Sequence, residues 1–275
     1  MEVGIINSMF KAYTPQENAK RIAAYGIKKV QLDLAFNGKA YSIDELTPEF
    51  CSDVRNAFAD EGIEIVAISG HQKIAFPETD ARQAAKNQFL RKLVLPQRFG
   101  CTTIVSETGS ANPDNAWVDH PNNYLPEVWD AVVGTMKEIC ARAKEEGVTF
   151  ALEPHFGQLT KSPRTLRRML DDVQTPNLKI ALDMANMVIE QNSGDTCALI
   201  NEFFTLCGND LSMVHAKDTK IINCKSVFVG AGKGVLDYIY LVKQLKEIRY
   251  DGPILLEYVN EEGIQNAYDF LKGLL

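Results

Sequence analysis

The sequence lacks a hydrophobic segment long enough to cross a membrane. No apolar run among its 275 residues approaches the roughly 20 that a transmembrane helix needs. The amino terminus also lacks the basic region of a secretory signal, because the acidic Glu2 is followed directly by a strand-like segment. We therefore expect no membrane association and a cytoplasmic location.

Positive charge is scarce relative to negative charge. The chain has 29 Lys and Arg against 36 Asp and Glu, a formal net charge of −7, and an acidic chain is a poor general partner for nucleic acid. The cysteines also lack the short paired spacing of a zinc knuckle or a disulfide framework. We expect them to be reduced thiols, as in a cytosolic protein. They are Cys51, Cys101, Cys140, Cys197, Cys207 and Cys224.

Short apolar runs alternate along the chain with longer segments of helical spacing. Because the runs are almost continuously apolar, they are typical of strands buried on both faces, as in a parallel sheet. The predicted strands are Val3–Asn7, Lys28–Leu34, Ile63–Ser69, Thr102–Ser106, Val148–Glu153, Leu178–Asp183, Leu211–Ala216 and Pro253–Tyr258. The predicted helices are Pro15–Tyr25, Asp44–Glu61, Asp80–Phe99, Leu125–Glu146, Pro163–Asp172, Ala198–Leu206, Leu236–Ile248 and Glu261–Leu274.

This alternation predicts an α/β fold with eight strand–helix units of about 34 residues each. Glycine closes several of the helices just before the next strand and suits a left-handed C-cap; these are Gly26, Gly62, Gly100, Gly147 and Gly252. Eight such units match the size of a (β/α)8 TIM barrel. No linker interrupts them, so we predict a single domain over residues 1–275, with a doubly wound open sheet as the alternative.

Four residues at the ends of the last four predicted strands are suitable metal ligands. In a (β/α)8 barrel the active site lies at the carboxyl ends of the strands, where the sequence places Glu153, Asp183, His215 and Glu257. A single acid of this kind is more often a helix cap or an ion-pair partner, and a single His is more often a hydrogen-bonded core residue. Four together indicate a mixed oxygen and nitrogen site for Mn²⁺, Mg²⁺, Co²⁺ or Zn²⁺.

Other polar residues near the strand ends are candidates for substrate binding. His155 and Lys217 lie two residues beyond Glu153 and His215, and His71 and Glu107 end the third and fourth strands, as Asp33 ends the second. Each has an ordinary structural alternative, namely a loop hydrogen bond, a cap or a surface charge. The segment from Gly230 to Gly234 fits neither a Walker loop nor a dinucleotide motif. We expect a tight turn there whose amides bind a phosphate.

The motifs around these residues resemble the xylose isomerase-like barrels of sugar-phosphate isomerases and epimerases. The resemblance rests on ALEPH around Glu153, ALDMANM around Asp183, VHAKD around His215, LLEY around Glu257, and VGAGKGVLDY after the seventh strand. It implies that the four residues bind one divalent metal ion, with Mn²⁺ as our first choice. It also implies that Glu153 and Glu257 face opposite sides of a sugar as acid and base.

This chemistry predicts an isomerase or epimerase that acts on a sugar or sugar phosphate. A divalent ion stabilises an enediolate, and two carboxylates move the proton between the two faces of the substrate. A dehydratase or lyase acting on a keto-sugar or keto-inositol is the alternative, because such enzymes use the same scaffold. Relatives of this kind are often dimers or tetramers, so a homo-oligomer is also expected.

The sequence departs from the family pattern at several positions. After the sixth strand, ketose 3-epimerases carry a His where this chain has Asn186, which we assign to substrate binding, and the Asn expected after Glu153-Pro154 is His155. Apurinic endonucleases of the superfamily use several more histidines, whereas this chain has four in total. An endonuclease and a sugar-binding barrel without catalysis are therefore the weaker alternatives, and we expect no nucleic-acid partner.

Overall fold

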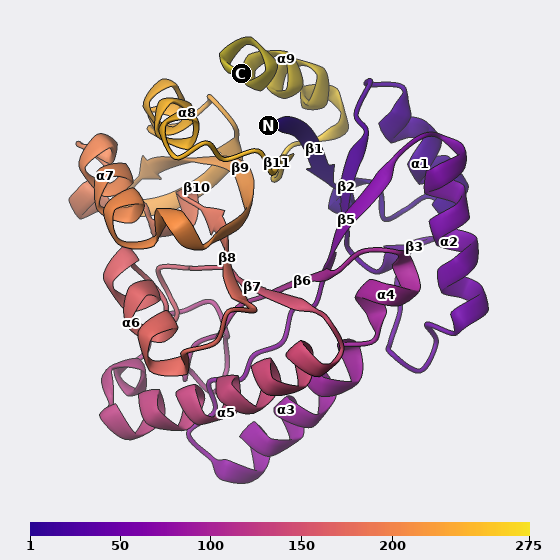
Figure 1. Ribbon diagram of the computed structural model, residues 1–275. Coiled ribbons are helices and arrows are strands. Elements are labelled where there is room, and N and C mark those ends of the chain that lie inside the picture. The colour runs from indigo at the N-terminus through magenta and orange to yellow at the C-terminus, as the bar shows by residue number, and fades with distance from the viewer.

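A computed structural model describes residues 1–275 and shows a closed barrel of eight parallel strands surrounded by helices (Figure 1). The strands of the barrel are β1 (Glu2–Ile6), β2 (Lys29–Leu32), β5 (Glu64–Ser69), β6 (Thr103–Ser106), β7 (Thr149–Leu152), β8 (Leu178–Asp183), β9 (Leu211–Ile222) and β11 (Pro253–Leu256). Each pairs with its neighbours in this order, and β11 also pairs with β1, so the sheet has no open edge. The predicted (β/α)8 TIM barrel is confirmed.

The helices form the outer ring, as Figure 1 shows. They are α1 (Pro15–Ala23), α2 (Pro48–Asp60), α3 (Thr79–Lys92), α4 (Leu95–Phe99), α5 (Pro126–Glu145), α6 (Pro163–Val173), α7 (Thr196–Cys207), α8 (Tyr238–Glu247) and α9 (Ile264–Leu274). Short 3₁₀ turns occupy Asn7–Phe10, Pro121–Tyr124, Ala185–Met187, Glu190–Asn192, Gly208–Asp210 and Glu261–Gly263. None of the helices has the length and apolar character that spanning a membrane would require.

Several helices begin at a hydroxyl residue followed by proline. Thr14 accepts a hydrogen bond from the amide of Glu17, and Ser162 accepts one from Thr165 at the start of α6. The proline that follows each cap has no backbone N–H that would need a partner, and its ring already fixes a helical φ. Proline is therefore well suited to the first helical position. These local signals fix where the helices begin beside the barrel.

Two hydrophobic cores stabilise the barrel. The larger core lies between the strands and the helices, and Phe58, Phe89 and Phe150 are among its largest buried side chains. The smaller core fills the interior of the barrel with one apolar side chain from each of seven strands, namely Ile6, Ala67, Val105, Ala151, Ala181, Met213 and Leu255. The eighth strand, β2, places the polar Gln31 among the buried residues instead.

The predicted helix Asp80–Phe99 is wrong as a single element. The chain forms α3 up to Lys92 and a separate α4 from Leu95. Pro96 explains the break, because its ring cannot donate a backbone hydrogen bond and would clash with the carbonyl four residues earlier.

The seventh predicted strand is longer than expected. β9 continues to Ile222, turns at Asn223 and Cys224, and returns as the antiparallel strand β10 (Lys225–Gly230). Both turn residues have positive φ, 51° and 61°, as a two-residue hairpin turn requires. A second small hairpin, β3 (Ala35–Phe36) with β4 (Lys39–Ala40), follows β2.

The predicted glycine C-caps agree with the structure except at Gly252. The other four glycines have positive φ, whereas before β11 the left-handed residue is Arg249, with φ 58°. There the chain turns three residues earlier than the glycine suggested.

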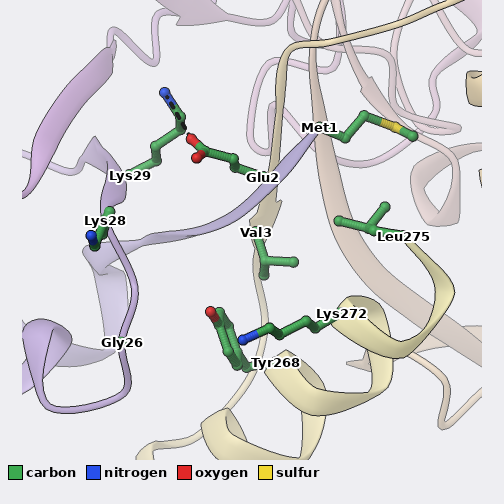
Figure 2. Close-up of a pocket in the computed structure, with 9 residues that line it drawn as sticks. All are labelled: Met1, Glu2, Val3, Gly26, Lys28, Lys29, Tyr268, Lys272 and Leu275. Atoms are coloured by element: carbon green, nitrogen blue, oxygen red, sulfur yellow. Dashed lines mark ion pairs between the residues drawn. The ribbon is translucent and has the colours of Figure 1, made fainter.

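The amino-terminal end of the barrel carries a hollow of about 420 Å³ (Figure 2). Its lining comes from the start of β1, the residues before β2, and α9, and it includes Lys28, Lys272 and Tyr268. The side chain of Lys29 is already paired with Glu2 and Glu64. This hollow lies at the end of the strands opposite to the one where barrel active sites occur.

Candidate metal centre and substrate site

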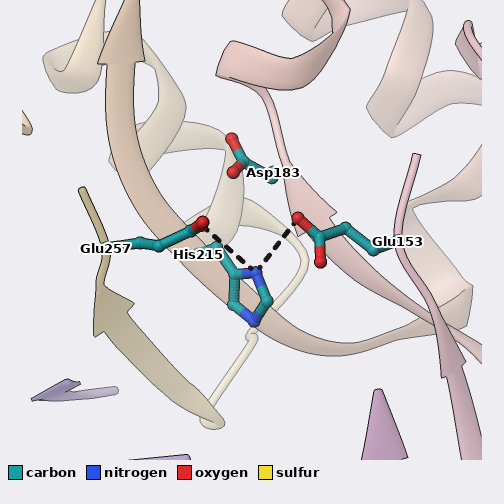
Figure 3. Close-up of side chains that lie close together, drawn as sticks. All are labelled: Glu153, Asp183, His215 and Glu257. Carbon is teal, nitrogen blue, oxygen red and sulfur yellow. Dashed lines mark ion pairs between the residues drawn. The ribbon is translucent and has the colours of Figure 1, made fainter. Parts of the chain in front are cut away.

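Four consecutive strands of the barrel bring four ligating side chains together (Figure 3). Asp183 is the last residue of β8 and lies beside His215 of β9 in the strand register, while Glu153 and Glu257 directly follow β7 and β11. One ligating atom from each side chain lies within 4.8 Å of the others. Asp183 and His215 are buried, with 0% and 2% of their surface exposed.

The Nδ1 atom of His215 lies between the two glutamates. It is 3.5 Å from Glu153 Oε1 and 3.6 Å from Glu257 Oε2, the contacts drawn in Figure 3. Both His215 Nδ1 and Glu257 Oε2 are buried atoms that have no hydrogen-bond partner. Since buried polar atoms are rarely left unpaired in folded proteins, this arrangement fits a cation held among these atoms.

Gln31 fixes the orientation of the His215 ring. Gln31 Oε1 lies 2.9 Å from His215 Nε2, and Gln31 Nε2 donates to Ser69 Oγ at 3.0 Å. Because an amide oxygen only accepts, Nε2 carries a proton, so Nδ1 is the nitrogen that faces the carboxylates and can offer its lone pair to a metal ion once it is unprotonated. Ligating histidines in metal sites commonly have such an outer partner. Gln31 was not among the predicted site residues. In the sequence it stands out only as a polar residue inside an apolar strand.

The carboxylates of this cluster are too close together to ionise independently. Burial raises the pKa of Asp183 to about 8, with the charges of Glu257 and Glu153 acting in the same direction and Lys217 opposing them. Burial also acts to raise the pKa of Glu153, but the positive charges of His215 and Lys217 lower it to about 2. A divalent ion bound among these side chains would supply positive charge to all three carboxylates and so favour their ionised forms.

Lys217 and Asn186 lie against the carboxylates of the cluster. Lys217 Nζ is 2.8 Å from Asp183 Oδ2 and 3.1 Å from Glu257 Oε1. The side-chain amide of Asn186 donates to Glu153 Oε1 at 2.8 Å, and its backbone amide donates to Asp183 Oδ1 at 3.3 Å. Both residues were assigned to substrate binding, which stays a prediction. In the structure Lys217 contacts Asp183 and Glu257, and Asn186 contacts the Glu153 oxygen that faces His215.

His155 is enclosed by aromatic rings beside this cluster. Its ring centroid is 5.1 Å from that of Trp117 and 4.3 Å from that of Phe156, and only 6% of the residue is exposed. Its Nδ1 accepts a hydrogen bond from the amide of Gly157. Burial, followed by the charge of Lys217, lowers the pKa of His155 to about 4, so the ring is neutral near pH 7. A neutral ring with Nδ1 accepting carries its proton on Nε2.

The remaining candidates lie on the other side of the same barrel end. His71 Nδ1 is 2.9 Å from Glu107 Oε2, and His71 Nε2 is 3.9 Å from Asp33 Oδ1. Burial acts to lower the pKa of His71, but the hydrogen bond and charge of Glu107 raise it to about 10. The structure therefore divides the predicted residues into two groups, one around His215 and one around His71.

The chain is similar to known proteins over most of its length. A family model described as a xylose isomerase-like TIM barrel matches residues 19–274. The chain belongs to this family. An uncharacterised protein of Methanocaldococcus jannaschii is 27% identical over 210 residues, covering 72% of this chain and 68% of that protein. An inosose dehydratase of Geobacillus thermodenitrificans is 20% identical over 185 residues, covering 61% of this chain and 60% of that enzyme.

Several solved structures have the same fold. A D-tagatose 3-epimerase-like protein superimposes with a TM-score of 0.76 at 18% identity, over 100% of this chain and 97% of that chain. A 3-keto-D-glucoside 4-epimerase of E. coli gives 0.76 at 18% identity, over 99% of each chain. A xylose isomerase-like barrel protein of Mycobacterium smegmatis, in complex with magnesium, gives 0.72 at 14% identity, over 100% of this chain and 96% of that chain.

The segment Gly230–Gly234 of this xylose isomerase-like chain was expected to bind a phosphate through its amides. Buried Asp218 accepts hydrogen bonds from the amides of Gly234 and of Leu236, just beyond the segment. A Cβ at Gly234 would lie 2.2 Å from the carbonyl oxygen of Thr219, so the glycine allows this close approach. The amide of Gly234 is therefore already occupied by the protein's own carboxylate, and phosphate binding by the rest of the segment stays a prediction.

Proposed function

We propose that the protein is a divalent-metal-dependent isomerase or epimerase of a keto-sugar. The observation that carries this proposal is the convergence of Glu153, Asp183, His215 and Glu257 within 4.8 Å at the carboxyl end of the barrel. These four residues are the proposed metal ligands. Their mixed oxygen and nitrogen donors suit Mn²⁺, our first choice, and also Mg²⁺, Co²⁺ or Zn²⁺. The magnesium complex of the Mycobacterium smegmatis barrel supports a divalent metal ion in a protein of this fold.

Glu153 and Glu257 are the proposed acid and base. Removing a proton from the carbon beside a carbonyl leaves negative charge on the carbonyl oxygen, and Lewis-acid stabilisation of that charge is what a divalent ion supplies when bound. The two glutamates follow β7 and β11 and approach His215 from opposite sides (Figure 3). One carboxylate can therefore remove a proton from one face of the substrate while the other returns a proton to the opposite face.

The two glutamates have different surroundings. Only Oε1 of Glu153 accepts a side-chain hydrogen bond, from Asn186, so its other oxygen is available to remove a proton. Glu257 Oε1 accepts a hydrogen bond from Lys217, and Glu257 Oε2 is the oxygen that faces His215 Nδ1, so neither oxygen of Glu257 is free. This difference makes Glu153 the stronger candidate for the base that starts the reaction.

Five further residues are proposed to contact the substrate or to position the glutamates. His155 presents an Nε2–H donor, while Lys217 donates to Glu257 Oε1 and Asn186 to Glu153 Oε1. His71 and Glu107 contribute from the other side of the barrel end. The sugar-epimerase names of two structural neighbours support a small carbohydrate as the substrate.

A dehydratase or lyase is the second candidate function. It is favoured by the similarity to an inosose dehydratase. Elimination also starts with proton removal beside a carbonyl, so the same base would serve. An endonuclease is disfavoured because Asn186 stands where those enzymes carry a histidine metal ligand, and its side-chain amide is hydrogen-bonded to Glu153. All six cysteines are free, in keeping with a cytoplasmic location.

The test is a screen of ketoses and keto-inositols in D₂O with added Mn²⁺, Co²⁺ or Mg²⁺, read by NMR. Deuterium should enter one carbon beside the carbonyl, and the product should show whether the outcome is isomerisation, epimerisation or loss of water. Glu153→Gln and Glu257→Gln should each lower kcat about 100-fold or more. Glu61→Gln, which changes an exposed residue at the end of α2, is the matched control. Near-normal turnover in either active-site variant would rule out the two-glutamate scheme.

A further inference from the structure

The half of the barrel end that lacks the proposed metal ligands carries its own polar group. Asp33 follows β2, His71 lies two residues beyond β5, and Glu107 follows β6. β2, β5 and β6 are consecutive strands of the sheet, and β6 neighbours β7, which leads into Glu153. Ser106 lies beside Leu152 in the strand register and accepts from the amide of Glu153, so Glu107 and Glu153 leave adjacent strands at the same level and the two groups belong to one continuous mouth. We call Asp33, His71 and Glu107 the β2–β6 triad.

The triad is closed on one side and open on the other. Glu107 is 4% exposed, and its Oε2 lies 2.9 Å from His71 Nδ1, so that nitrogen donates to a buried carboxylate. The other ring nitrogen, Nε2, is 3.9 Å from Asp33 Oδ1, which is longer than a hydrogen bond. Asp33 Oδ1 has no partner, although it is buried. Each side chain as a whole is partly exposed, 48% for His71 and 27% for Asp33.

A hydroxyl group complements this open side. It can accept a hydrogen bond from the imidazole and donate one to the carboxylate, whereas a phosphate dianion only accepts and is repelled by Asp33. A second metal ion fits less well, because Glu107 and Asp33 lie beside opposite nitrogens of the ring. An ion bound to one nitrogen would have only one of the two carboxylates beside it.

The charge of the mouth also disfavours an anionic substrate. Five carboxylates lie there, on Asp33, Glu107, Glu153, Asp183 and Glu257. The cationic side chains beside them are already paired, Lys217 with Asp183 and Glu257, and His71 with Glu107. One divalent ion would leave the mouth with no surplus of positive charge. In the glycine loop, the amide of Gly234 already donates to Asp218 and the amide of Lys233 to the carbonyl of Gly230.

We propose that the β2–β6 triad is a hydroxyl-binding subsite and that the enzyme acts on an uncharged polyhydroxylated ketone, not on a phosphate ester. Asp33 accepts from a substrate hydroxyl that also accepts from His71, and Glu107 keeps the imidazole in position. The inference about the substrate class rests on the function proposed above. The inference about the subsite is tested separately, with ligands that have no carbonyl and cannot react.

The first experiment measures equilibrium binding by calorimetry, with Mn²⁺ present. The probes are myo-inositol and D-sorbitol, compared with D-sorbitol 6-phosphate. Asp33→Asn and His71→Gln should each weaken binding of the neutral polyols about tenfold, the typical effect of losing a hydrogen bond to a charged group. Asp60→Asn, an exposed acid at the end of α2, should change nothing. Circular dichroism checks that each variant folds, and Asp33→Ser is a second variant should Asp33→Asn fail to fold.

Three results would overturn the inference: tighter binding of the phosphate ester than of the polyols, unchanged polyol binding in both triad variants, or two metal ions per chain with one lost in His71→Gln. The second experiment compares deuterium exchange into 2-keto-myo-inositol and D-fructose with exchange into D-fructose 6-phosphate. A preference for the ester overturns the proposed substrate class and leaves the proposed function intact. No exchange into any ketone counts against the proposed function, while the polyol binding still decides the subsite.

Discussion

Replacing Gln31 tests whether the hydrogen bond behind His215 prepares the metal centre. Gln31 is 1% exposed, accepts from His215 Nε2 at 2.9 Å and donates to Ser69 Oγ at 3.0 Å. Gln31→Leu keeps a similar volume but removes both hydrogen bonds. The His215 ring would then lose the contact that selects its tautomer and directs Nδ1 toward the carboxylates.

The structure sets the expected size of the effect. Two buried polar groups, the N–H of His215 and the hydroxyl of Ser69, lose their partner, and each such loss costs about 1–3 kcal/mol. Because Ser69 is 8% exposed and its hydroxyl can rotate, we expect the free energy of unfolding to fall by about 2–4 kcal/mol. Loss of an outer partner of a ligating His weakens metal binding about 10- to 100-fold.

Urea denaturation of the metal-free protein and calorimetric titration with Mn²⁺ measure the two effects separately. Ser69→Ala is the graded control, because it removes the support of Gln31 and leaves the His215 contact in place. It should lower stability by about 1 kcal/mol and change Mn²⁺ affinity less than Gln31→Leu does. If Gln31→Leu bound Mn²⁺ as tightly as the wild type, the reasoning about the tautomer would be refuted.

Three further predictions follow from other parts of the molecule. In the native protein at pH 8, a thiol reagent should label exposed Cys224 quickly and half-buried Cys197 slowly, and mass spectrometry should find the four buried cysteines unmodified. The folded-state pKa of His71 is about 10, above its ordinary value of 6.5, so the contribution of His71 to stability is complete below pH 6.5 and is lost as the pH rises toward 10. The free energy of unfolding, measured in urea at pH 6 and at pH 9.5, should therefore differ less between the two pH values in His71→Gln than in the wild type. Gly157→Ala should lower stability by about 1–3 kcal/mol, because its Cβ would lie 2.0 Å from the Trp117 carbonyl oxygen, and a loss below 0.5 kcal/mol would contradict that packing argument.

The barrel could be predicted from the sequence because each strand is an apolar run and most helices begin or end at a local signal. The elements that escaped prediction depend on weaker features. The β9–β10 hairpin turns at Asn223 and Cys224, and cysteine is not a residue that indicates positive φ. Pro96 was visible in the sequence, but the segments on both sides of it are helical, so the two helices were predicted as one.

The candidate site was predictable only as a set of strand ends. The positions of Glu153 and Asp183 follow from the barrel, because the carboxyl ends of its strands meet at one rim. The roles of Gln31 and Asp218 did not follow, since each depends on contacts between residues far apart in the chain. The role of Asp218 follows only from the structure, in which the amides of Gly234 and Leu236 donate to its carboxylate.

The order in which the ring closes has a consequence for how the protein matures. β11 is synthesised after the other seven barrel strands, it fits between β9 and β1, and Glu257 follows it directly. A nascent chain therefore holds three of the four proposed ligands before the fourth arrives with β11. If the proposed site binds an ion, metal binding and closure of the barrel should stabilise each other, and a chain shortened before β11 would lose the proposed metal site and the closed barrel together.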